Sequence, residues 1–372
     1  MTSWQQLEPW LRLSCIQSIG PVRVQRLLQH FKSPQQVLSA SLAELKAGIP
    51  EACARAIVEQ KNSGDIAKKL DKARGWMDAS EAHHILCVES DAYPVQLKEL
   101  PDPPSILYVV GNPVLLSEPQ LAIVGSRRPT PQGRRVAAEI AGVLARSGFV
   151  ITSGMAMGID GAAHQGTLAG YGNTVAVLGT GVDQVYPRSH LSLYSEIIEQ
   201  GGAIVSELPL GTSPNPANFP RRNRVISGLS LGVLVVEAAI ESGSLISARL
   251  AAEQGREVFA IPGSVMNPLS KGCHKLIREG AVLVESAEDI LLELKPEIQH
   301  LLLESEGCAV SITKCTDPAH KKILEAMGFD VISPDLISSL CSIPYDELSV
   351  ILTDMELSGF IQSVPGGFLR SC

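Results

Sequence analysis

Two patterns of hydrophobic positions divide the chain. In residues 1–75, apolar side chains such as Leu7, Trp10 and Leu11 recur at the three- and four-residue spacing of an amphipathic helix. From about His84 the pattern changes to short, almost wholly apolar runs separated by helical stretches. Strands of a sheet that is covered on both faces are apolar at nearly every position, so these runs predict a parallel sheet between two helical layers.

This central region, residues 81–295, is expected to form a doubly wound, Rossmann-like α/β domain. The expected strands are Ile85–Val88, Ile106–Val110, Leu121–Val124, Phe149–Thr152, Thr174–Leu178, Ala203–Ser206, Val233–Val236, Val258–Ile261 and Ala281–Val284. The expected helices are Gly133–Ser147, Gly158–Ala169, Ser189–Gln200, Ser244–Gln254 and Ser270–Glu279.

A separate helical domain is predicted for residues 1–80. Its turns Gly20-Pro21 and Gly48-Ile49-Pro50 each open a helix and resemble helix-hairpin-helix or SAM-like units. The N-terminal amides of such helices can face a DNA phosphate. An ordinary turn with proline in the first helical position explains the same residues, and we favour it over phosphate contact.

The C-terminal residues predict a linker, 296–316, followed by a winged-helix domain, 317–372. Its expected parts are helices at Pro318–Met327, Ser333–Leu340 and Tyr345–Ser358 and a hairpin at Gly359–Leu369. The third helix, which usually enters a DNA groove, carries Asp346, Glu347, Asp354 and Glu356 and no lysine or arginine. Carboxylates repel DNA phosphates, so this domain is expected to contact protein or regulate the chain.

Composition agrees with a folded protein of the cytoplasm. Of the 372 residues, 45% are hydrophobic and 19% charged, and no apolar run approaches the length of a membrane span. The first residues lack the features of a signal peptide. The eight cysteines form no CxxC pair, as expected for buried thiols in a reducing compartment. No membrane segment and no metal site are expected.

The distribution of charged residues along the chain is more informative about a ligand than the net charge. The chain carries a net charge of −8, but residues 1–75 hold 11 basic and 6 acidic residues. No lysine occurs between Lys98 and Lys271, and arginines instead gather beside turns. The guanidinium group can bind a phosphate through two parallel hydrogen bonds, so local arginine clusters in an acidic domain suggest a specific anion site.

These arginines lie in loops that follow expected strands, where ligands of doubly wound sheets bind. Any one such loop is usually only a tight turn, but several at one sheet edge favour an extended polyanion site. The candidate residues are Gly125, Ser126, Arg127, Arg128, Ser153, Gly154, Met155, Gly158, Gly181, Phe219, Arg221, Arg222, Asn223, Arg224, Ser242, Gly243, Ser244 and Lys271.

The sequence motifs that would indicate an enzyme are weaker than those that indicate an anion site. The Gly179-Thr180-Gly181 sequence has Gln184 where the dinucleotide fingerprint needs glycine, and no P-loop is present. Asp160 and His164 stand one helical turn apart and fit acid–base work, although a contact that stabilises the helix explains them better. Glu237 ends a strand and is either a catalytic carboxylate or a cap of the next helix. No catalytic residue and no cofactor are expected.

The ordered motifs resemble those of the DprA/Smf family of DNA-processing proteins. The resemblance covers about residues 120–285 and is most specific in Phe219-Pro220-Arg221-Arg222-Asn223-Arg224 and the Ile226-Ser227-Gly228-Leu229-Ser230 that follows. Further matches are Gly125-Ser126-Arg127, Ser153-Gly154, Gly158-Ile159-Asp160, His164, Tyr186-Pro187, Val235-Val236-Glu237-Ala238, Ser242-Gly243-Ser244, Pro262-Gly263, Ser270-Lys271-Gly272, Leu276-Ile277 and Gly280-Ala281.

The resemblance implies a homodimer that binds single-stranded DNA, protects incoming strands, helps displace single-strand-binding protein and loads RecA recombinase in natural transformation, without established catalysis. Carried onto this chain, it implies that Arg127 and Arg221–Arg224 hold phosphates and that the Gly154–Gly158 turn donates amides. Dimer and recombinase contacts would lie in His274–Leu283, at His274, Ile277 and Leu283.

Two alternatives remain open. The same Rossmann variant resembles nucleotide phosphoribohydrolases, in which Arg127 and Glu237 would act on a nucleoside monophosphate, but their PGGxGT motif is absent. A pure adaptor, acting through its helical and winged ends, would have no DNA affinity. If the chain does bind single strands, the few aromatic residues near the loops, Phe219, Tyr171 and Tyr186, are the expected stacking surfaces, and phosphate contacts are expected to dominate.

Overall fold

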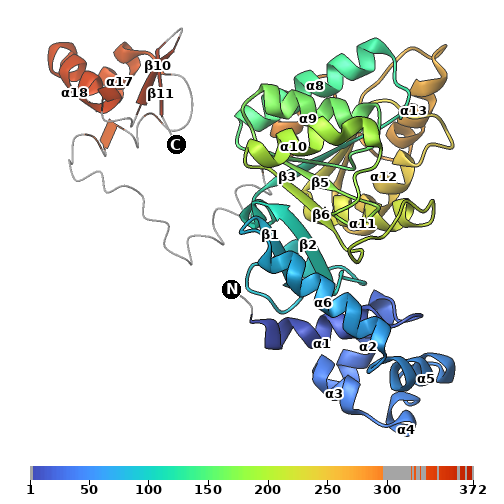
Figure 1. The fold of residues 1–372 in the computed structure, drawn as a ribbon. Helices are drawn as coiled ribbons and strands as arrows, with labels where there is room; N and C mark the ends of the chain where they lie inside the picture. The colour runs from blue at the N-terminus through green and yellow to red at the C-terminus, as the bar shows by residue number, and fades with distance from the viewer. Residues whose placement is uncertain are drawn as a thin grey trace. The chain divides into compact units, whose positions relative to one another are not determined.

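The computed structural model describes residues 3–295, 320, 322–323, 327, 332–341, 343–357, 361–364 and 367–370. The chain forms two compact units, Met1–Ile298 and Gln299–Cys372. Figure 1 shows the course of the chain through both. The expected linker, 296–316, lies outside the described residues, as does most of the expected helix Pro318–Met327.

The first unit begins with six helices: α1 (Trp4–Ser14), α2 (Pro21–Phe31), α3 (Pro34–Ser39), α4 (Leu42–Leu45), α5 (Glu51–Gln60) and α6 (Gly64–Asp78). Serine side chains cap three of them: Ser33, Ser41 and Ser63 accept hydrogen bonds from amides of the first turn. Both glycine–proline turns open a helix, α2 and α5, as the sequence predicts.

The nine expected strands are all present and form one sheet. They are β1 (His83–Cys87), β2 (Ile106–Gly111), β3 (Gln120–Val124), β4 (Val150–Ser153), β5 (Thr174–Val177), β6 (Ala203–Ser206), β7 (Gly232–Val235), β8 (Glu257–Ala260) and β9 (Val282–Leu283). Their order is β1-β2-β6-β5-β4-β3-β7-β8-β9.

The prediction of an entirely parallel sheet is wrong at one edge. Strand β2 pairs antiparallel with β6, and β1 pairs antiparallel with β2. The other seven strands, in the sheet order β6-β5-β4-β3-β7-β8-β9, all run parallel to one another. An apolar run reports that a strand is buried but not its direction, so the sequence pattern could not distinguish the two arrangements.

Helices cover both faces of the sheet (Figure 1). Helices α8 (Pro131–Arg146), α9 (Ile159–Ala169) and α10 (Leu191–Glu199) pack together on one face. Helices α11 (Asn218–Leu229), α12 (Ser244–Glu253) and α13 (Lys271–Arg278) form the other layer, with the short α7 (Val95–Lys98) against α11. Helix α14 (Ala287–Glu293) packs on α8.

The helix α11 was not expected. The arginine-rich segment Phe219–Arg224 was expected to be a loop, but it forms the first two turns of this helix. Pro220 is the third helical residue, a position at which the missing amide has no partner in the helix.

The strand order places a topological switch point between β3 and β7. The chain moves outward from β3 through β4 and β5 to β6, then returns along α11 to β7 on the other side of β3. The loops that follow β3 and β7 therefore diverge, and the crevice between them is where doubly wound sheets bind ligands.

The N-terminal helices pack against the antiparallel edge of the sheet. The indole ring of Trp76 in α6 stacks on the His83 ring at the start of β1, with 4.2 Å between ring centroids. Trp10 Nε1 in α1 donates a hydrogen bond to Glu89 Oε2 over 3.2 Å. These contacts join residues 3–80 to the sheet within the first unit.

The second unit contains helices α17 (Pro334–Cys341) and α18 (Tyr345–Leu357) and an antiparallel hairpin of β10 (Ile361–Val364) and β11 (Gly367–Arg370). Its own apolar core includes Ile337, Leu348 and Leu352. Within the residues described above, no helix of either unit has the length and apolarity needed to cross a bilayer.

Candidate functional site

A pocket of about 370 Å³ opens at the switch point of the sheet. We call it the switch-point pocket. The loops that follow β3, β4 and β7 and the first turns of α11 contribute to it. Its lining residues are Val124, Gly125, Arg127, Ala156, Asp160, Tyr186, Pro214, Pro216, Phe219, Pro220, Arg222, Asn223, Ile226, Ser242, Gly243, Ser244, Ile246 and Ser247.

Many of the residues singled out from the sequence meet here, although they come from three separate segments of the chain. They are Gly125, Arg127, Phe219, Arg222, Asn223, Ser242, Gly243 and Ser244. The prediction that loops from several strands converge on one site agrees with this placement.

Aromatic and cationic side chains form one wall of the pocket. The guanidinium carbon of Arg127 lies 5.6 Å from the centroid of the Phe219 ring, and that of Arg222 lies 6.0 Å from it. The Tyr186 ring is tilted against Phe219, with 5.7 Å between centroids. An aromatic surface surrounded by arginines offers a base a stacking partner and its phosphate a charge.

The two arginines on this wall differ in burial. Arg127 is exposed, whereas Arg222 is only 5% exposed. Arg222 Nη1 donates hydrogen bonds to the carbonyl oxygens of Val177 and, over 2.6 Å, Gly154. Burial lowers the pKa of Arg222 to about 10, so the group keeps its charge at neutral pH. Arg222 is thus a fixed cation, and Arg127 is a solvated one.

A buried carboxylate also lines the pocket. Asp160 Oδ2 accepts hydrogen bonds from the amides of Gly154, over 3.1 Å, and Ala156, over 3.3 Å. Burial raises the pKa of Asp160, and the nearby positive charge of Arg222 opposes that rise. These two amides already have an acceptor, so the expectation that the whole Gly154–Gly158 turn donates to phosphate does not hold for them.

Asp160 and His164 do not act as an acid–base pair in this arrangement. His164 is fully buried, its Nδ1 lies 2.7 Å from Thr174 Oγ1, and burial lowers its pKa to about 3. The imidazole is therefore neutral at physiological pH and links α9 to β5.

The loop after β3 is held by Glu237. Its carboxylate accepts hydrogen bonds from Thr130 N over 2.8 Å and Thr130 Oγ1 over 2.7 Å, just ahead of α8. Its main-chain oxygen accepts from Ser126 N over 2.6 Å. The expected cap at the helix after Glu237 is not formed, because α12 has no side-chain cap; the carboxylate holds Thr130, the N-cap of α8, instead. Ser126 Oγ in turn accepts from the amide of exposed Arg128, and neither Ser126 nor Arg128 is in the pocket lining.

Several predicted residues support the loops instead of lining the pocket. Ser153 Oγ donates to Ile123 O over 2.6 Å, and Met155 is fully buried. Gly158 has φ +90°, and a Cβ there would lie 2.2 Å from Ser126 O, so only glycine lets the two loops approach. The amide of Gly181 donates to Thr212 O over 3.0 Å. Exposed Lys271 begins α13, outside the pocket lining.

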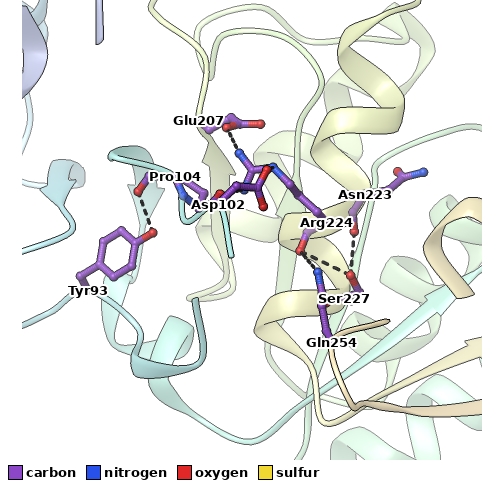
Figure 2. A network of polar contacts seen from close by, with 8 residues as sticks. All are labelled: Tyr93, Asp102, Pro104, Glu207, Asn223, Arg224, Ser227 and Gln254. Carbon is purple, nitrogen blue, oxygen red and sulfur yellow. Dashed lines mark hydrogen bonds and ion pairs between the residues drawn. The ribbon is translucent and has the colours of Figure 1, made fainter. Parts of the chain in front are cut away.

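Arg224 departs furthest from the expectation that it binds phosphate. It is buried, and its guanidinium forms ion pairs with Glu207 and, at 3.2 Å, with Asp102 (Figure 2). Arg224 Nη1 also donates to Asp102 O over 2.8 Å. Because two carboxylates already engage its guanidinium, we assign Arg224 a structural role and leave it out of the site.

Sequence reasoning missed the proline-bearing segment before α11, which contributes Pro214 and Pro216, and the start of α12, which contributes Ile246 and Ser247. The closely spaced prolines directly before Phe219 were an available signal for a rigid approach to the site. Tyr171, an expected stacking surface, follows α9 at the far ends of the strands and is not in the pocket lining.

The expected dimer contacts lie together near the β9 edge of the sheet. His274 Nε2 is 3.0 Å from Gly263 O, Ile277 is half-buried against the core, and Leu283 is 48% exposed on β9. In the described part of the chain, no group of three or more His, Cys, Asp or Glu residues is placed to hold a metal ion.

Fold and site together define an α/β protein with a Rossmann-like sheet, a helical N-terminal segment and a cationic, aromatic pocket at the switch point. The family model described as DNA recombination-mediator protein A matches residues 84–295, and that of the DprA winged helix domain matches residues 312–367. The chain belongs to this family, DprA/Smf, as the motifs indicated, and the winged-helix prediction is confirmed.

The relatives match over most of the chain. Protein Smf of Escherichia coli is 40% identical over 98% of this chain and 95% of its own length. The X-ray structure of DprA from Streptococcus pneumoniae has a TM-score of 0.67 and 36% identity, covering 79% of this chain and 98% of that one. The structure of DprA from Helicobacter pylori, a protein described as having a unique single-stranded DNA binding mode, has a TM-score of 0.52 and 32% identity, covering 57% and 97%.

Proposed function

We propose that the chain binds single-stranded DNA in the switch-point pocket and acts as a recombination mediator. The observation that carries this proposal is the wall formed by Phe219, Tyr186, Arg127 and Arg222. Such a wall can stack an unpaired base while a cation meets its phosphate. The single-stranded DNA binding described for the Helicobacter pylori relative supports the same ligand.

Arg127 and Arg222 have different roles in the pocket because they differ in burial. Exposed Arg127 can move to a phosphate, whereas Arg222 supplies a fixed positive potential from below. Bases in a duplex are stacked on each other, so a strand must be unpaired before a base reaches Phe219. Binding should therefore favour single strands, show little sequence preference and weaken steeply as salt increases.

The wider role follows the family. We propose that the chain acts in the cytoplasm as a homodimer formed near His274, Ile277 and Leu283. It protects incoming single strands, helps displace single-strand-binding protein and loads RecA recombinase during natural transformation. Residues 81–295 carry the DNA site, and the winged-helix domain regulates it or contacts a protein.

The test measures fluorescence anisotropy of a labelled single strand and of its duplex over a salt series. Replacing Arg127 and Phe219 together with alanine should reduce single-strand affinity at least tenfold, because stacking contributes about 1–3 kcal/mol per base. Arg135→Ala is the matched control, since Arg135 is an exposed arginine on α8 paired with Glu139 outside the pocket. Equal affinity of the double variant and the control would refute the proposed site.

A further inference from the structure

A second pocket, of about 320 Å³, lies where the N-terminal helices meet the sheet. We call it the seam pocket. The turn before α2, the start of β2, the segment after β6 and α11 all contribute. Its lining residues are Ser14, Ser18, Ile19, Gly20, Pro21, Arg23, Val24, Ser105, Ile106, Glu207, Leu208, Pro209 and Arg221.

The first turn of α11 separates the seam pocket from the switch-point pocket. Pro220 lines the switch-point pocket, and the next residue, Arg221, lines the seam pocket. A helix with its side chains is about 10 Å across, so the two pockets open on either side of a barrier that one extended strand can cross.

The seam pocket has a cationic lining. Arg221 of α11 is exposed, and Arg23 of α2 is half-buried, with its guanidinium donating to Ser18 O. Helix α2 begins here, with Gly20 at its N-cap and no capping side chain; Pro21 has no amide hydrogen, and the amides of Arg23 and Val24 donate to Gly20 O. The N-terminal end of a helix attracts anions, so helix and arginines favour a phosphate at the same place.

Glu207, which lines the same pocket, carries a buried acceptor without a donor. The side chain of Glu207 is only 6% exposed; Oε2 pairs with Arg224, while Oε1 has no hydrogen-bond partner among the described residues (Figure 2). A buried carboxylate oxygen without a donor is unfavourable. The amino group of a nucleobase is a donor that carboxylates accept in nucleic-acid complexes.

We propose that the seam pocket is a second nucleotide subsite, which holds the phosphate of a single strand at Arg23, Arg221 and the start of α2 and accepts a base amino group at Glu207. The strand is the one that occupies the switch-point pocket, so this inference rests on the proposed function. The N-terminal helices thereby become part of the DNA site, and strands long enough to cross α11 bind more tightly than short ones.

The test adds a negative charge at the pocket mouth without disturbing the fold. A Cβ on Gly20 meets no atom within 4 Å, its φ is −93°, and aspartate is a favoured N-cap residue, so Gly20→Asp should fold at least as well as the parent chain. Gly64→Asp is the matched control, because Gly64 is equally unobstructed, opens α6 and does not line the pocket.

Affinities of the full chain are compared for strands of about 5 and about 20 nucleotides. Gly20→Asp should weaken binding of the longer strand about tenfold, reduce its salt slope by about one and leave the shorter strand unchanged. If Gly20→Asp and Gly64→Asp bind both strands alike, the seam pocket is not a DNA subsite. In that case the proposed function still holds if the variant with alanine at Arg127 and Phe219 loses affinity for the single strand. If that variant also keeps its affinity, both proposals are refuted.

A second comparison tests the role of Glu207. Cytosine carries an amino group and thymine does not, so the parent chain should bind a long cytidine strand more tightly than a long thymidine strand. Gly20→Asp should reduce that preference, because it repels the strand from the pocket, whereas Gly64→Asp should retain it. A preference that is absent, or equal in all three proteins, would overturn base recognition by Glu207.

Discussion

Three arginines of one short run have three different environments. Arg221 is exposed at the seam pocket, Arg222 is buried against carbonyl oxygens in the wall of the switch-point pocket, and Arg224 is buried between carboxylates. Successive residues of a helix point about 100° apart, so neighbouring side chains of α11 enter different surroundings. The arginine run was recognisable in the sequence as part of a candidate site, but the sequence could not assign a role to each guanidinium.

Removing the Arg224 side chain should destabilise the first unit. Arg224→Met leaves the buried Glu207 without its partner, which costs about 3–5 kcal/mol of unfolding free energy. Urea unfolding followed by tryptophan fluorescence measures this change, because Trp4, Trp10 and Trp76 all lie in the first unit. An unchanged unfolding midpoint would show that the ion pair contributes nothing to stability.

The same variant has a defined pH dependence. Burial raises the pKa of Glu207, and the positive charge of Arg224 opposes that rise. Without Arg224 the folded-state pKa rises further above its unfolded value. A carboxyl group of this kind favours folding below its unfolded pKa, and that contribution is lost as pH increases through the folded pKa. The destabilisation by Arg224→Met should therefore be smaller at about pH 5 than at about pH 7.

Alanine substitutions at two glycines near the switch-point pocket should affect the stability of the chain differently. A Cβ on Gly154 would lie 2.5 Å from Arg222 Nη1, which is held by carbonyl oxygens, whereas a Cβ on Gly243 meets nothing within 4 Å. Gly154→Ala should lower stability by about 1–3 kcal/mol and weaken DNA binding, because it displaces Arg222. Gly243→Ala should leave stability unchanged. Thermal unfolding of the two variants distinguishes these outcomes.

At the scale of elements, the strands were predictable and one helix was not. Strands such as β3 and β5 are buried at every position, so their apolar runs mark them without ambiguity. Five of the first seven residues of α11, Asn218–Arg224, are polar, and the fold buries some of them through hydrogen bonds and ion pairs. Helical periodicity is read from apolar residues, so a helix whose buried face carries arginines gives little signal.

The convergence of the loops was predictable because ligands of doubly wound sheets bind at the carboxyl ends of the strands. The contact that Asp160 makes with the turn before it was not predicted. Asp160 follows a glycine-rich turn that also fits an anion site, and only the folded chain shows that its carboxylate, instead of a phosphate, accepts the amides of Gly154 and Ala156.

The β9 edge gives a prediction for assembly. Strand β9 ends the sheet, and Leu283 is 48% exposed there. Leu283→Lys should convert the proposed dimer to a monomer, because a lysine on an unpaired edge opposes association. Val114→Lys is the control, since Val114 is 62% exposed but precedes β3 in a separate 3₁₀ turn. Sedimentation velocity measures both, and a Leu283→Lys dimer would place the interface elsewhere.

At the scale of the whole molecule, the two units differ in charge and have separate cores. Residues 299–372 carry 4 basic and 10 acidic residues, a net charge of −6, whereas residues 1–298 carry 27 basic and 29 acidic residues, a net charge of −2. The core of the second unit is formed by its own residues, such as Met355 and Ile361. DNA affinity should therefore depend on the first unit.

Deleting residues 305–372 should leave single-strand affinity unchanged or slightly higher. The deletion removes a net charge of −5, which reduces repulsion of the strand. Anisotropy titrations of the shortened and full-length chains at equal salt measure the effect, with tryptophan fluorescence as the check on folding. A sharp fall in affinity would show that the winged-helix domain binds DNA despite its charge.

Helix α11 carries residues of both pockets on neighbouring positions of a single turn. Inserting or deleting one residue between Phe219 and Arg224 would rotate all later side chains by about 100°, moving Arg224 away from its carboxylates and exchanging the surroundings of the others. Single replacements in this run each affect one contact, but a change of length affects all of them together. Over evolutionary time, this stretch should therefore tolerate exchanges of residue type far better than insertions or deletions.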